Sequence, residues 1–435
     1  MIRVLHRWPG LLALALILVL TLSGAALSVF PALERLSTPQ ATAGMSVADL
    51  AARIIAVHPG VEQIKRAPSG RIRAYWFSDG QPGGGIIDPA TGEAVAPPDR
   101  NPVESWLTDL HRSLFLGDGG RWTMAAGAAL MLVMALSGAL LVARRLGGWR
   151  RWLAPARGPL SGRLHVEIGR IAVIGLTLSS LTALWMTAST FGYLPDGEPL
   201  PAFPDQVSGE TGLAISDIAV LRDMPLANFR ELSFPYADDP TDVYTIASDS
   251  GTGYIDQGTG ELVSWAPLSM WQRISETVYM LHTGQGAALL GLILGLMALG
   301  VPVMAVTGMI LWWAGRRARP RIRGNAAAAR AETVILVGSE GGSTWGFAAT
   351  LHRALSAAGQ SVHVGAMSGF APRRFARAQR IIVLAATYGD GNAPASARGF
   401  LARLEKLDTP PRAPVAVLGF GDRAFPYFCA YASAV

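Results

Sequence analysis

The chain has 435 residues; half are hydrophobic, 16% are charged, and the mean hydropathy is +0.32. This balance excludes an ordinary soluble globule and indicates that a lipid bilayer is part of the fold. The formal net charge of +6 comes from a basic set that is almost all arginine. We attribute it to orientation in a membrane and expect no nucleic-acid partner. With a single cysteine, Cys429, these residues can form no intrachain disulfide.

Four apolar runs are each about as long as the roughly 20 residues that cross a hydrocarbon core. They cover residues 11–30, 122–142, 168–186 and 287–313. The first run has a basic start but does not end in a small-residue cleavage site, so we interpret it as an uncleaved anchor. The sequence therefore predicts an α-helical membrane bundle with four spanning helices.

Arginine clusters set the expected topology. They precede the first run (Arg3 and Arg7), join the second to the third (144–163) and follow the fourth (316–323). Positive charge next to a span favours the cytoplasmic side. We expect a bacterial inner-membrane protein whose N-terminus and C-terminal region are cytoplasmic, with both connecting modules in the periplasm.

The membrane part has the pattern of a duplication. Elements of the first half recur in the same order in the second: His6 as His165, Ser23-Gly24 as Thr182-Ala183, the stretch 88–93 (DPATGE) as 256–261 (DQGTGE), and His111 as His282. One duplication with loop insertions explains this order. In each connector an alternating stretch, 71–79 or 242–248, predicts a strand, so we expect two small α+β modules.

The repeated order of span, acidic turn motif, histidine and span ends in VTGMILWW (306–313) before a basic tail. It resembles the PepSY-associated transmembrane family over roughly residues 1 to 323. Members of that family include inner-membrane reductases of ferric siderophores, and some carry fused flavoprotein domains. The resemblance implies that the two periplasmic modules are PepSY-like.

Four of the seven histidines, His6, His111, His165 and His282, lie near the starts of the apolar runs. Imidazole is a common ligand of haem iron, and a low-spin haem takes two axial ligands. Topology and duplication pair His6 with His165 on the cytoplasmic side, and His111 with His282 on the outer side. We predict two b-type haems; the alternative is four polar residues at the level of the lipid headgroups.

Two further features concern the helices. The glycines at 117, 119 and 120 predict a break after His111, which would place this histidine on a short interfacial helix. The pairs Ser23-Gly24, Ser137-Gly138 and Thr307-Gly308 lie deep in the spans, and we interpret them as sites of close helix packing that would also leave room for a flat macrocycle.

After residue 332 the pattern changes to that of an α/β domain. Apolar strands predicted at 333–338, 380–386 and 413–420 each run into a glycine-containing loop, and a helix at 345–357 follows the first loop. Ligands bind at the carboxyl ends of strands in such open sheets, and a glycine loop before a helix favours a phosphate. The three loops together resemble the flavodoxin-like FMN domain of sulfite reductase flavoproteins and other diflavin reductases.

The resemblance implies an FMN site. The phosphate would be held by Ser339, Glu340, Gly341, Gly342, Ser343 and Thr344. The isoalloxazine would be flanked by Thr387, Tyr388, Gly389, Asp390 and Gly391 on one side and by Gly421, Asp422 and Phe425 on the other, with Tyr388 stacked on the ring. Gly341 and Phe425 depart from the threonine and tyrosine usual in the family, and the alternative is an α/β domain with a degenerate site.

We expect the flavodoxin-like domain to be incomplete, because we find only four of the five expected strands before Val435. We expect FAD and NADPH to bind in a missing domain or a partner subunit. The expected segments are spans at 1–30, 111–143, 165–189 and 281–314, periplasmic modules at 31–110 and 190–280, a basic loop at 144–164, a linker at 315–332 and the flavodoxin-like domain at 333–435.

The sequence thus predicts a membrane flavocytochrome that passes electrons from NADPH through FMN and two haems to a periplasmic acceptor, with a ferric siderophore as the expected acceptor. No catalytic acid or base is expected. One alternative is a PepSY-type membrane anchor that binds a partner protein and holds no haem. Another is a reductase of a periplasmic sulfur compound or protein.

Overall fold

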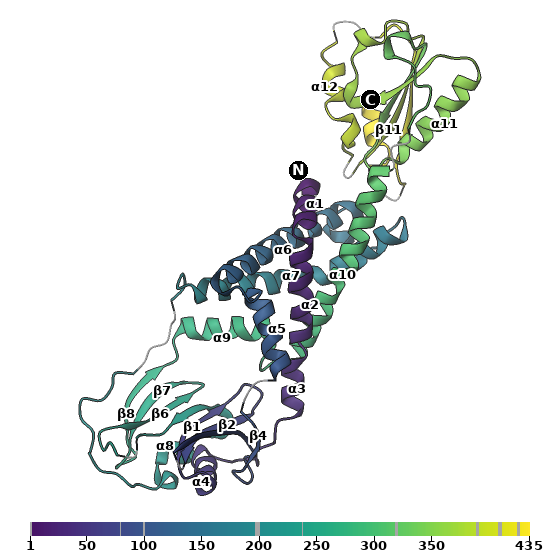
Figure 1. The fold of residues 1–435 in the computed structure, drawn as a ribbon. Coiled ribbons are helices and arrows are strands. Elements are labelled where there is room, and N and C mark those ends of the chain that lie inside the picture. The colour runs from purple at the N-terminus through teal and green to yellow at the C-terminus, as the bar shows by residue number, and fades with distance from the viewer. Residues whose placement is uncertain are drawn as a thin grey trace. The chain divides into compact units, whose positions relative to one another are not determined.

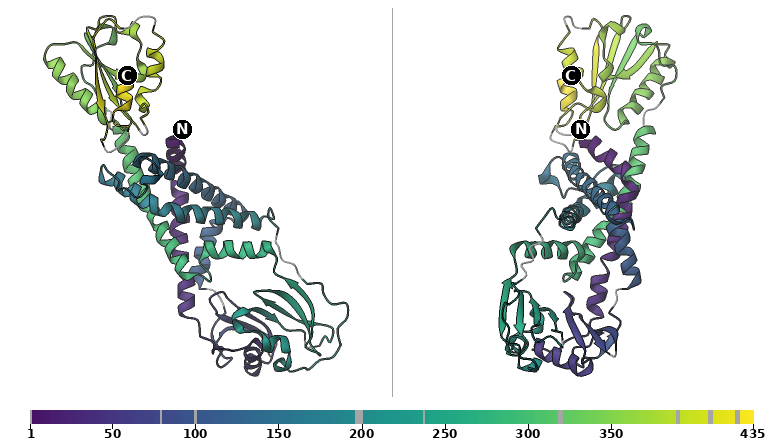
Figure 2. Two further views of the ribbon diagram at one scale, coloured as in Figure 1. Left: turned by 180° about the vertical axis from the view of Figure 1, so that it is seen from behind. Right: turned by 60° about the vertical axis from the view of Figure 1, so that its left-hand side comes forward.

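The computed structural model describes residues 2–78, 80–98, 101–195, 201–236, 238–317, 321–388, 391–407, 411–423 and 427–435 (Figures 1 and 2). Apart from the first two residues, the chain divides into two compact units. One contains residues 3–136 and 171–301, and the other contains 137–170 and 302–435.

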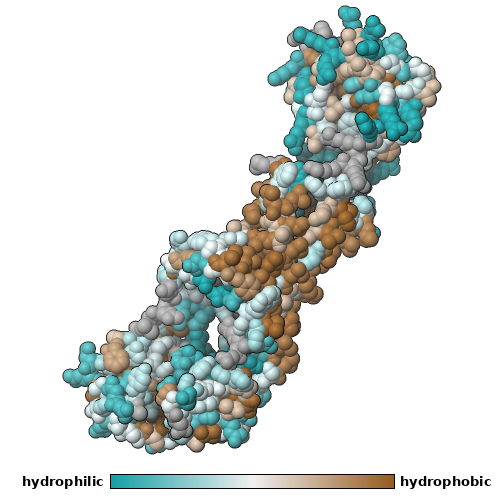
Figure 3. Space-filling model, in the orientation of Figure 1, coloured by the Kyte–Doolittle hydropathy of each residue, from teal (hydrophilic) through white to brown (hydrophobic). Residues whose placement is uncertain are grey.

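Among the described residues, four helical segments are long and apolar enough to span a bilayer, as predicted. They are Leu14–Leu36, which combines α2 (Leu14–Leu27) and α3 (Phe30–Leu36), then α6 (Gly117–Leu146), α7 (Leu160–Thr190) and Ala288–Ala314 of α10 (Ala288–Arg317). A further helix, α1 (Ile2–Leu12), carries His6 and precedes the first of them. Hydrophobic side chains gather on the surface of these long helices in Figure 3.

A separate helix precedes the second and the fourth span, and each carries one of the predicted ligands. His111 lies on α5 (Pro102–Ser113) and His282 lies on α9 (Met270–Thr283). The expected break after His111 is confirmed, although it falls at Leu114–Leu116, and the glycines at 119 and 120 lie inside α6. Side chains cap both helices at the start: Asn101 accepts from the Val103 amide at 2.9 Å and Ser269 from the Gln272 amide at 3.1 Å.

The two connecting modules form one antiparallel sheet of eight strands, in the order β4-β3-β2-β1-β5-β6-β7-β8. The first half supplies β1 (Val61–Arg66), β2 (Ile72–Ser78), β3 (Gln81–Ile87) and β4 (Ala94–Ala96); the second supplies β5 (Phe229–Ser233), β6 (Val243–Ser248), β7 (Gly251–Asp256) and β8 (Leu262–Pro267). Pairing of β1 with β5, with Ile64 opposite Leu232, joins the halves. Strands predicted at 71–79 and 242–248 correspond to β2 and β6.

Helices α4 (Val47–Val57) and α8 (Ala219–Asp223) pack on one face of this sheet. Leu50 and Ile54 of α4 share a single core with Leu221 of α8 and with the inward strand residues Ile64 and Leu232. A capping box in which Ser46 and Asp49 exchange side-chain and backbone bonds starts α4. The two halves therefore share one core, a union that the sequence did not predict.

The acidic turn motif folds alike in both halves. In 88–93 and 256–261 the amide of the leading aspartate donates to the carbonyl of the final glutamate at 2.9 Å. The glycine of each motif, Gly92 or Gly260, has a positive φ of 82° or 71° and donates back to that aspartate carbonyl. These equivalent turns support the duplication.

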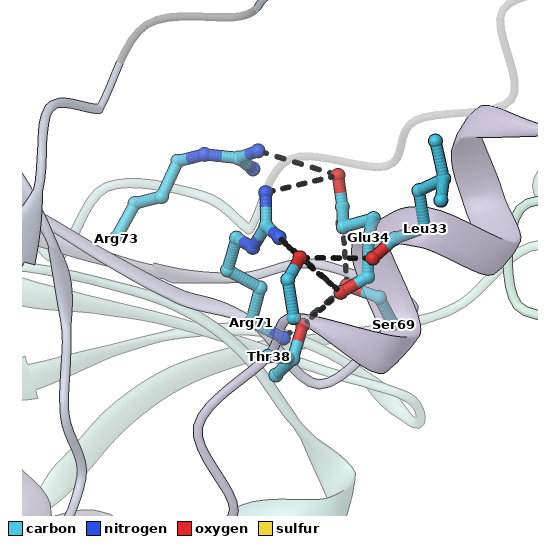
Figure 4. A network of polar contacts seen from close by, with 7 residues as sticks. Leu33, Glu34, Thr38, Ser69, Arg71 and Arg73 are labelled. Carbon is cyan, nitrogen blue, oxygen red and sulfur yellow. Dashed lines mark hydrogen bonds and ion pairs between the residues drawn. The ribbon is translucent and has the colours of Figure 1, made fainter.

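Two polar networks connect the sheet to helices of the same unit. Glu34 of α3 accepts the Ser69 hydroxyl at 2.5 Å and forms ion pairs of 3.6 Å with Arg71 and Arg73 (Figure 4). On the other half, Arg230 of β5 binds both carboxylate oxygens of Glu276 on α9. Bidentate pairs of this kind also fix orientation.

The C-terminal domain is a parallel four-stranded sheet in the order β10-β9-β11-β12, as expected for a flavodoxin-like fold. Its strands are β9 (Thr333–Gly338), β10 (Val362–Ala366), β11 (Arg380–Ala386) and β12 (Val415–Phe420). Helix α11 (Ser343–Ala357) covers one face with Ile335 and Val337 beneath it. On the other face, Val334 and Leu336 share a core with residues of α12 (Phe400–Leu404) and α13 (Ala430–Ala434).

Short 3-10 turns complete the described elements: η1 (Trp149–Arg151), η2 (Ile215–Asp217), η3 (Leu226–Asn228), η4 (Ala328–Arg330), η5 (Met367–Gly369), η6 (Pro372–Arg374) and η7 (Ala395–Ala397).

The α5–α6 turn gives the first testable prediction. A Cβ on Gly120 would lie 1.6 Å from the Ser113 carbonyl oxygen, whereas a Cβ on Gly119 would meet open space. Gly120→Ala should therefore force the turn open, separate α5 from α2 and lower stability by roughly 1–3 kcal/mol. Thermal unfolding of detergent-solubilised protein, followed by circular dichroism, measures the loss. Gly119→Ala is the matched control, and equal melting temperatures for the two variants would contradict the prediction.

Candidate functional site

The predicted site residues fall into two groups, the four histidines and the three loops of the C-terminal domain. The histidines are called the first pair (His6 and His165) and the second pair (His111 and His282).

The structure brings the second pair together. The ring centroids of His111 and His282 lie 6.2 Å apart, with 46° between the ring planes. The two residues are 171 positions apart in sequence and come from α5 and α9. Both belong to the same compact unit.

A hydroxyl group holds each ring of the second pair. Nδ1 of His111 lies 2.8 Å from the Ser23 hydroxyl oxygen, and Nδ1 of His282 lies 2.9 Å from that of Thr182. Ser23 and Thr182 each donate their own proton to the carbonyl one helical turn earlier, at 2.6 and 2.8 Å. Their oxygens therefore accept from the imidazoles, which places the ring proton on Nδ1 and a lone pair on Nε2.

The second pair is neutral near pH 7. Burial lowers the pKa of His111 to about 4, and the neighbouring His282 adds to the shift. Burial also lowers the pKa of His282. The neutral imidazole is the form that binds a metal through its lone pair.

The first pair shows the same arrangement with carbonyl acceptors. Nδ1 of His6 lies 3.1 Å from the Met134 carbonyl oxygen, and Nδ1 of His165 lies 3.1 Å from that of Met304. A carbonyl can only accept, so both Nδ1 atoms carry the proton and Nε2 again carries the lone pair. His6 and His165 belong to different units, so their pairing stays a prediction.

The second pair fits a metal held between two imidazoles. A metal bound to one nitrogen of each ring lies about 2 Å from each nitrogen, and each nitrogen lies roughly 1 Å from its ring centre, so the centres stand about 6 Å apart. Haem iron takes only two protein ligands of this kind. The described part of the chain contains no cluster of three or more His, Cys, Asp or Glu residues suited to a metal ion.

The loop after β9, where the FMN phosphate is predicted to bind, is held in shape by hydrogen bonds of Ser339 and Glu340. The buried Ser339 donates its amide to the Ser396 hydroxyl at 2.7 Å, and its own hydroxyl accepts the Gly342 amide at 3.1 Å. Glu340 accepts the Ala395 amide at 2.6 Å. Ser339 and Glu340 thus brace the loop. Ser396 was missed because it lies 57 residues further along and has no local signal.

The remaining loop residues are placed to meet an anion. Gly342 has a φ of 91° and turns the chain into α11, so Ser343 and Thr344 stand at the helix start, where amide groups and the helix dipole favour negative charge. A Cβ on Gly341 would meet open space, so the threonine usual in the family would fit there.

The loop after β11 is closed on itself. Tyr388 and Asn392 exchange two backbone hydrogen bonds of 3.0 and 2.8 Å, and Gly391 has a φ of 90°. The Thr387 hydroxyl accepts the Tyr431 amide at 3.2 Å, which ties the loop to α13. Gly389 and Asp390 lie outside the described residues.

The loop after β12 passes close to α13. A Cβ on Gly421 would lie 3.0 Å from the Cys429 amide nitrogen, so this position needs a small residue, and Asp422 beside it is exposed. Phe425 lies outside the described residues. Because β9, β11 and β12 are parallel, their following loops meet at one edge of the sheet, which is where an open α/β sheet binds a ligand.

Comparison with known proteins matches the membrane part and the C-terminal domain to two different families. A family model described as PepSY-associated TM region matches residues 3–316, and one described as Flavodoxin matches residues 335–435.

Several relatives match the flavodoxin region alone. The sulfite reductase (NADPH) flavoprotein alpha-component of Thiocapsa roseopersicina is 33% identical over 103 residues, 22% of this chain and 19% of that protein. Those of Photobacterium profundum and Bacillus subtilis are 30% and 29% identical over 106 residues, 24% of this chain and 18% of each relative. The chain spans about a fifth of the length of these relatives.

The flavodoxin match and the three loops support FMN as a cofactor of the C-terminal domain. The match to the membrane region covers well over half of the 435 residues. The chain is therefore a member of the PepSY-associated TM region family that carries a flavodoxin domain after its membrane part.

Proposed function

We propose that the chain is a membrane flavocytochrome oxidoreductase, which carries electrons from NADPH through FMN and two b-type haems to a ferric siderophore in the periplasm. NADPH is proposed as the electron source because the matched relatives are named as sulfite reductase (NADPH) flavoproteins. We further propose that NADPH and FAD bind in another domain or in a partner subunit. The cofactors, when bound, supply the one-electron chemistry, and the protein supplies ligands, spacing and orientation.

One observation carries the haem part of this proposal. His111 and His282 come from equivalent helices of the two halves, stand 6.2 Å apart, and both direct Nδ1 toward a hydroxyl acceptor. If these two half-buried imidazoles only packed against neighbouring helices, they would not need the same tautomer. The same tautomer in both rings leaves both Nε2 lone pairs available to a metal. The matching tautomer in the first pair extends the argument to a second haem.

Direction across the membrane is proposed from charge. The arginine clusters at the N-terminus, in the 144–163 loop and after the fourth span favour the cytoplasm. That topology would put the first pair and the flavodoxin domain on the cytoplasmic side, and the second pair and the eight-stranded sheet on the periplasmic side. Oxidation of one NADPH to NADP⁺ and a proton releases two electrons, enough to reduce two Fe(III) ions to Fe(II).

Haem binding gives the central prediction. Protein purified in detergent should show the Soret band and reduced α-band of low-spin bis-histidine haem, with two haems per chain. His282→Ala should remove about half of this absorbance, because one of two sites loses a ligand. His58→Ala changes a ring that stacks on Trp76 in the sheet domain and serves as the control. A wild-type protein without a Soret band would leave the PepSY-type binding protein as the better explanation.

The loop after β9 gives a prediction about the affinity for FMN. Thr344 is buried at the start of α11, so Thr344→Val should keep the packing and remove one hydroxyl donor to the FMN phosphate. A hydrogen bond to a charged group contributes about 1.5–3 kcal/mol, which corresponds to a loss of affinity of roughly 10-fold to 100-fold. Titration of FMN fluorescence measures the affinity. Thr350→Val, at an exposed site of the same helix, should bind FMN like the wild type.

Growth identifies the acceptor. A strain without the gene should grow poorly on a ferric siderophore as the only iron source, and the wild-type gene should restore growth. The His282→Ala variant should fail to restore it. Normal growth of the deleted strain would exclude the siderophore as a required acceptor and favour a periplasmic sulfur compound or protein.

A further inference from the structure

A hydroxyl residue followed by a small residue recurs in the spans, and three of these pairs contact a predicted ligand. Ser23-Gly24 meets His111, Thr182-Ala183 meets His282, and Thr307-Gly308 meets His165. The fourth pair, Ser137-Gly138, follows Met134 as Thr307-Gly308 follows Met304. Met134 and Met304 supply the carbonyls that accept from the first pair. The pairs therefore do more than allow close helix packing.

The hydroxyl of each contact is already oriented by its own helix. Ser23 donates to the Val19 carbonyl at 2.6 Å, Thr182 to that of Leu178 at 2.8 Å, and Thr307 to that of Val303 at 2.8 Å. With the proton engaged, the oxygen can only accept, and the helix backbone fixes where its lone pairs point. Each hydroxyl thus selects one imidazole tautomer.

The small residue beside it gives the ring room. A Cβ on Gly24 would lie 3.1 Å from Cε1 of His111, and a Cβ on Gly308 would lie 3.2 Å from Cε1 of His165. Both distances are tighter than ordinary van der Waals contact. A larger side chain would push the ring away from the hydroxyl.

The duplication has itself exchanged the hydroxyl residue. Serine stands at position 23 and threonine at the equivalent position 182, yet the two distances to Nδ1 differ by only 0.1 Å, at 2.8 and 2.9 Å. Both halves keep the hydroxyl oxygen, and the extra methyl group of threonine changes its distance to Nδ1 little.

We propose that Ser23 and Thr182 are positioning residues for the second histidine pair, which hold both imidazoles as ligands with Nε2 directed to a shared iron and raise their electron donation to it. The inference rests on the proposed function, because it concerns how this chain tunes a haem. An acceptor for the N–H group of a metal-bound imidazole fixes the ring and increases its basicity. Loss of such an acceptor typically lowers the affinity for the metal by 10-fold to 100-fold.

Four variants test the roles of the hydroxyls. Ser23→Ala and Thr182→Val remove the acceptor, while Ser23→Thr and Thr182→Ser exchange the residues as the duplication has done. Matched controls are Thr21→Val and Ser180→Ala, because these buried hydroxyls lie on the same helices and bond back to Ile17 and Leu176. The readouts are haem retention during dialysis against apomyoglobin and the midpoint potentials from spectroscopic redox titration, and neither depends on turnover.

Loss of either hydroxyl should raise one of the two midpoint potentials, because a less basic imidazole stabilises Fe(III) less. For a one-electron couple, a shift of about 59 mV in the midpoint potential corresponds to a tenfold change in the ratio of ferric to ferrous haem at a fixed potential. The same variants should lose one haem 10-fold to 100-fold more readily, while the exchanges and controls match the wild type. If two haems bind but Ser23→Ala and Thr182→Val leave both readouts unchanged, the positioning role is wrong and the proposed function stands. If the wild type binds no haem, both are wrong.

Discussion

The antiparallel pairing of β1 with β5 is the contact on which the membrane-proximal part of the structure depends. It joins the two halves within one sheet, through the register that sets Ile64 opposite Leu232. The halves share one sheet and one core, and each supplies one histidine-bearing helix, α5 in the first half and α9 in the second. The approach of His111 to His282 joins these two helices, so it could not arise from either half alone.

Local patterns in the sequence predict local features well. Hydropathy over about 20 residues found the four spans, period-two alternation found β2 and β6, and apolar β-branched runs found β9 and β11. Glycine content suggested that His111 lies on its own helix, although the residues with positive φ at the break are Leu114 and Phe115.

Contacts between distant segments lay beyond such patterns. The sequence of residues 61–66 does not indicate that β1 pairs with β5, because antiparallel pairing depends on the register of two strands more than 160 residues apart. The buried Ser396, which holds Ser339 in the phosphate loop, is equally invisible in the sequence. The repeated positions of the histidines led to their prediction as ligands, which stays a prediction, whereas their hydrogen-bond partners depend on how far each helix is rotated about its axis and leave no pattern in the sequence.

The contact between Arg230 and Glu276 has a mechanical consequence. Arg230 lies on β5, in the middle of the sheet, and Glu276 lies on α9, two helical turns before His282. In the first half a different contact links a helix to the sheet, the ion pairs of Glu34 on α3 with Arg71 and Arg73. A bidentate pair resists both sliding and rotation. The Arg230–Glu276 pair therefore fixes the rotation of α9 relative to β5, and with it the direction in which the His282 ring leaves the helix.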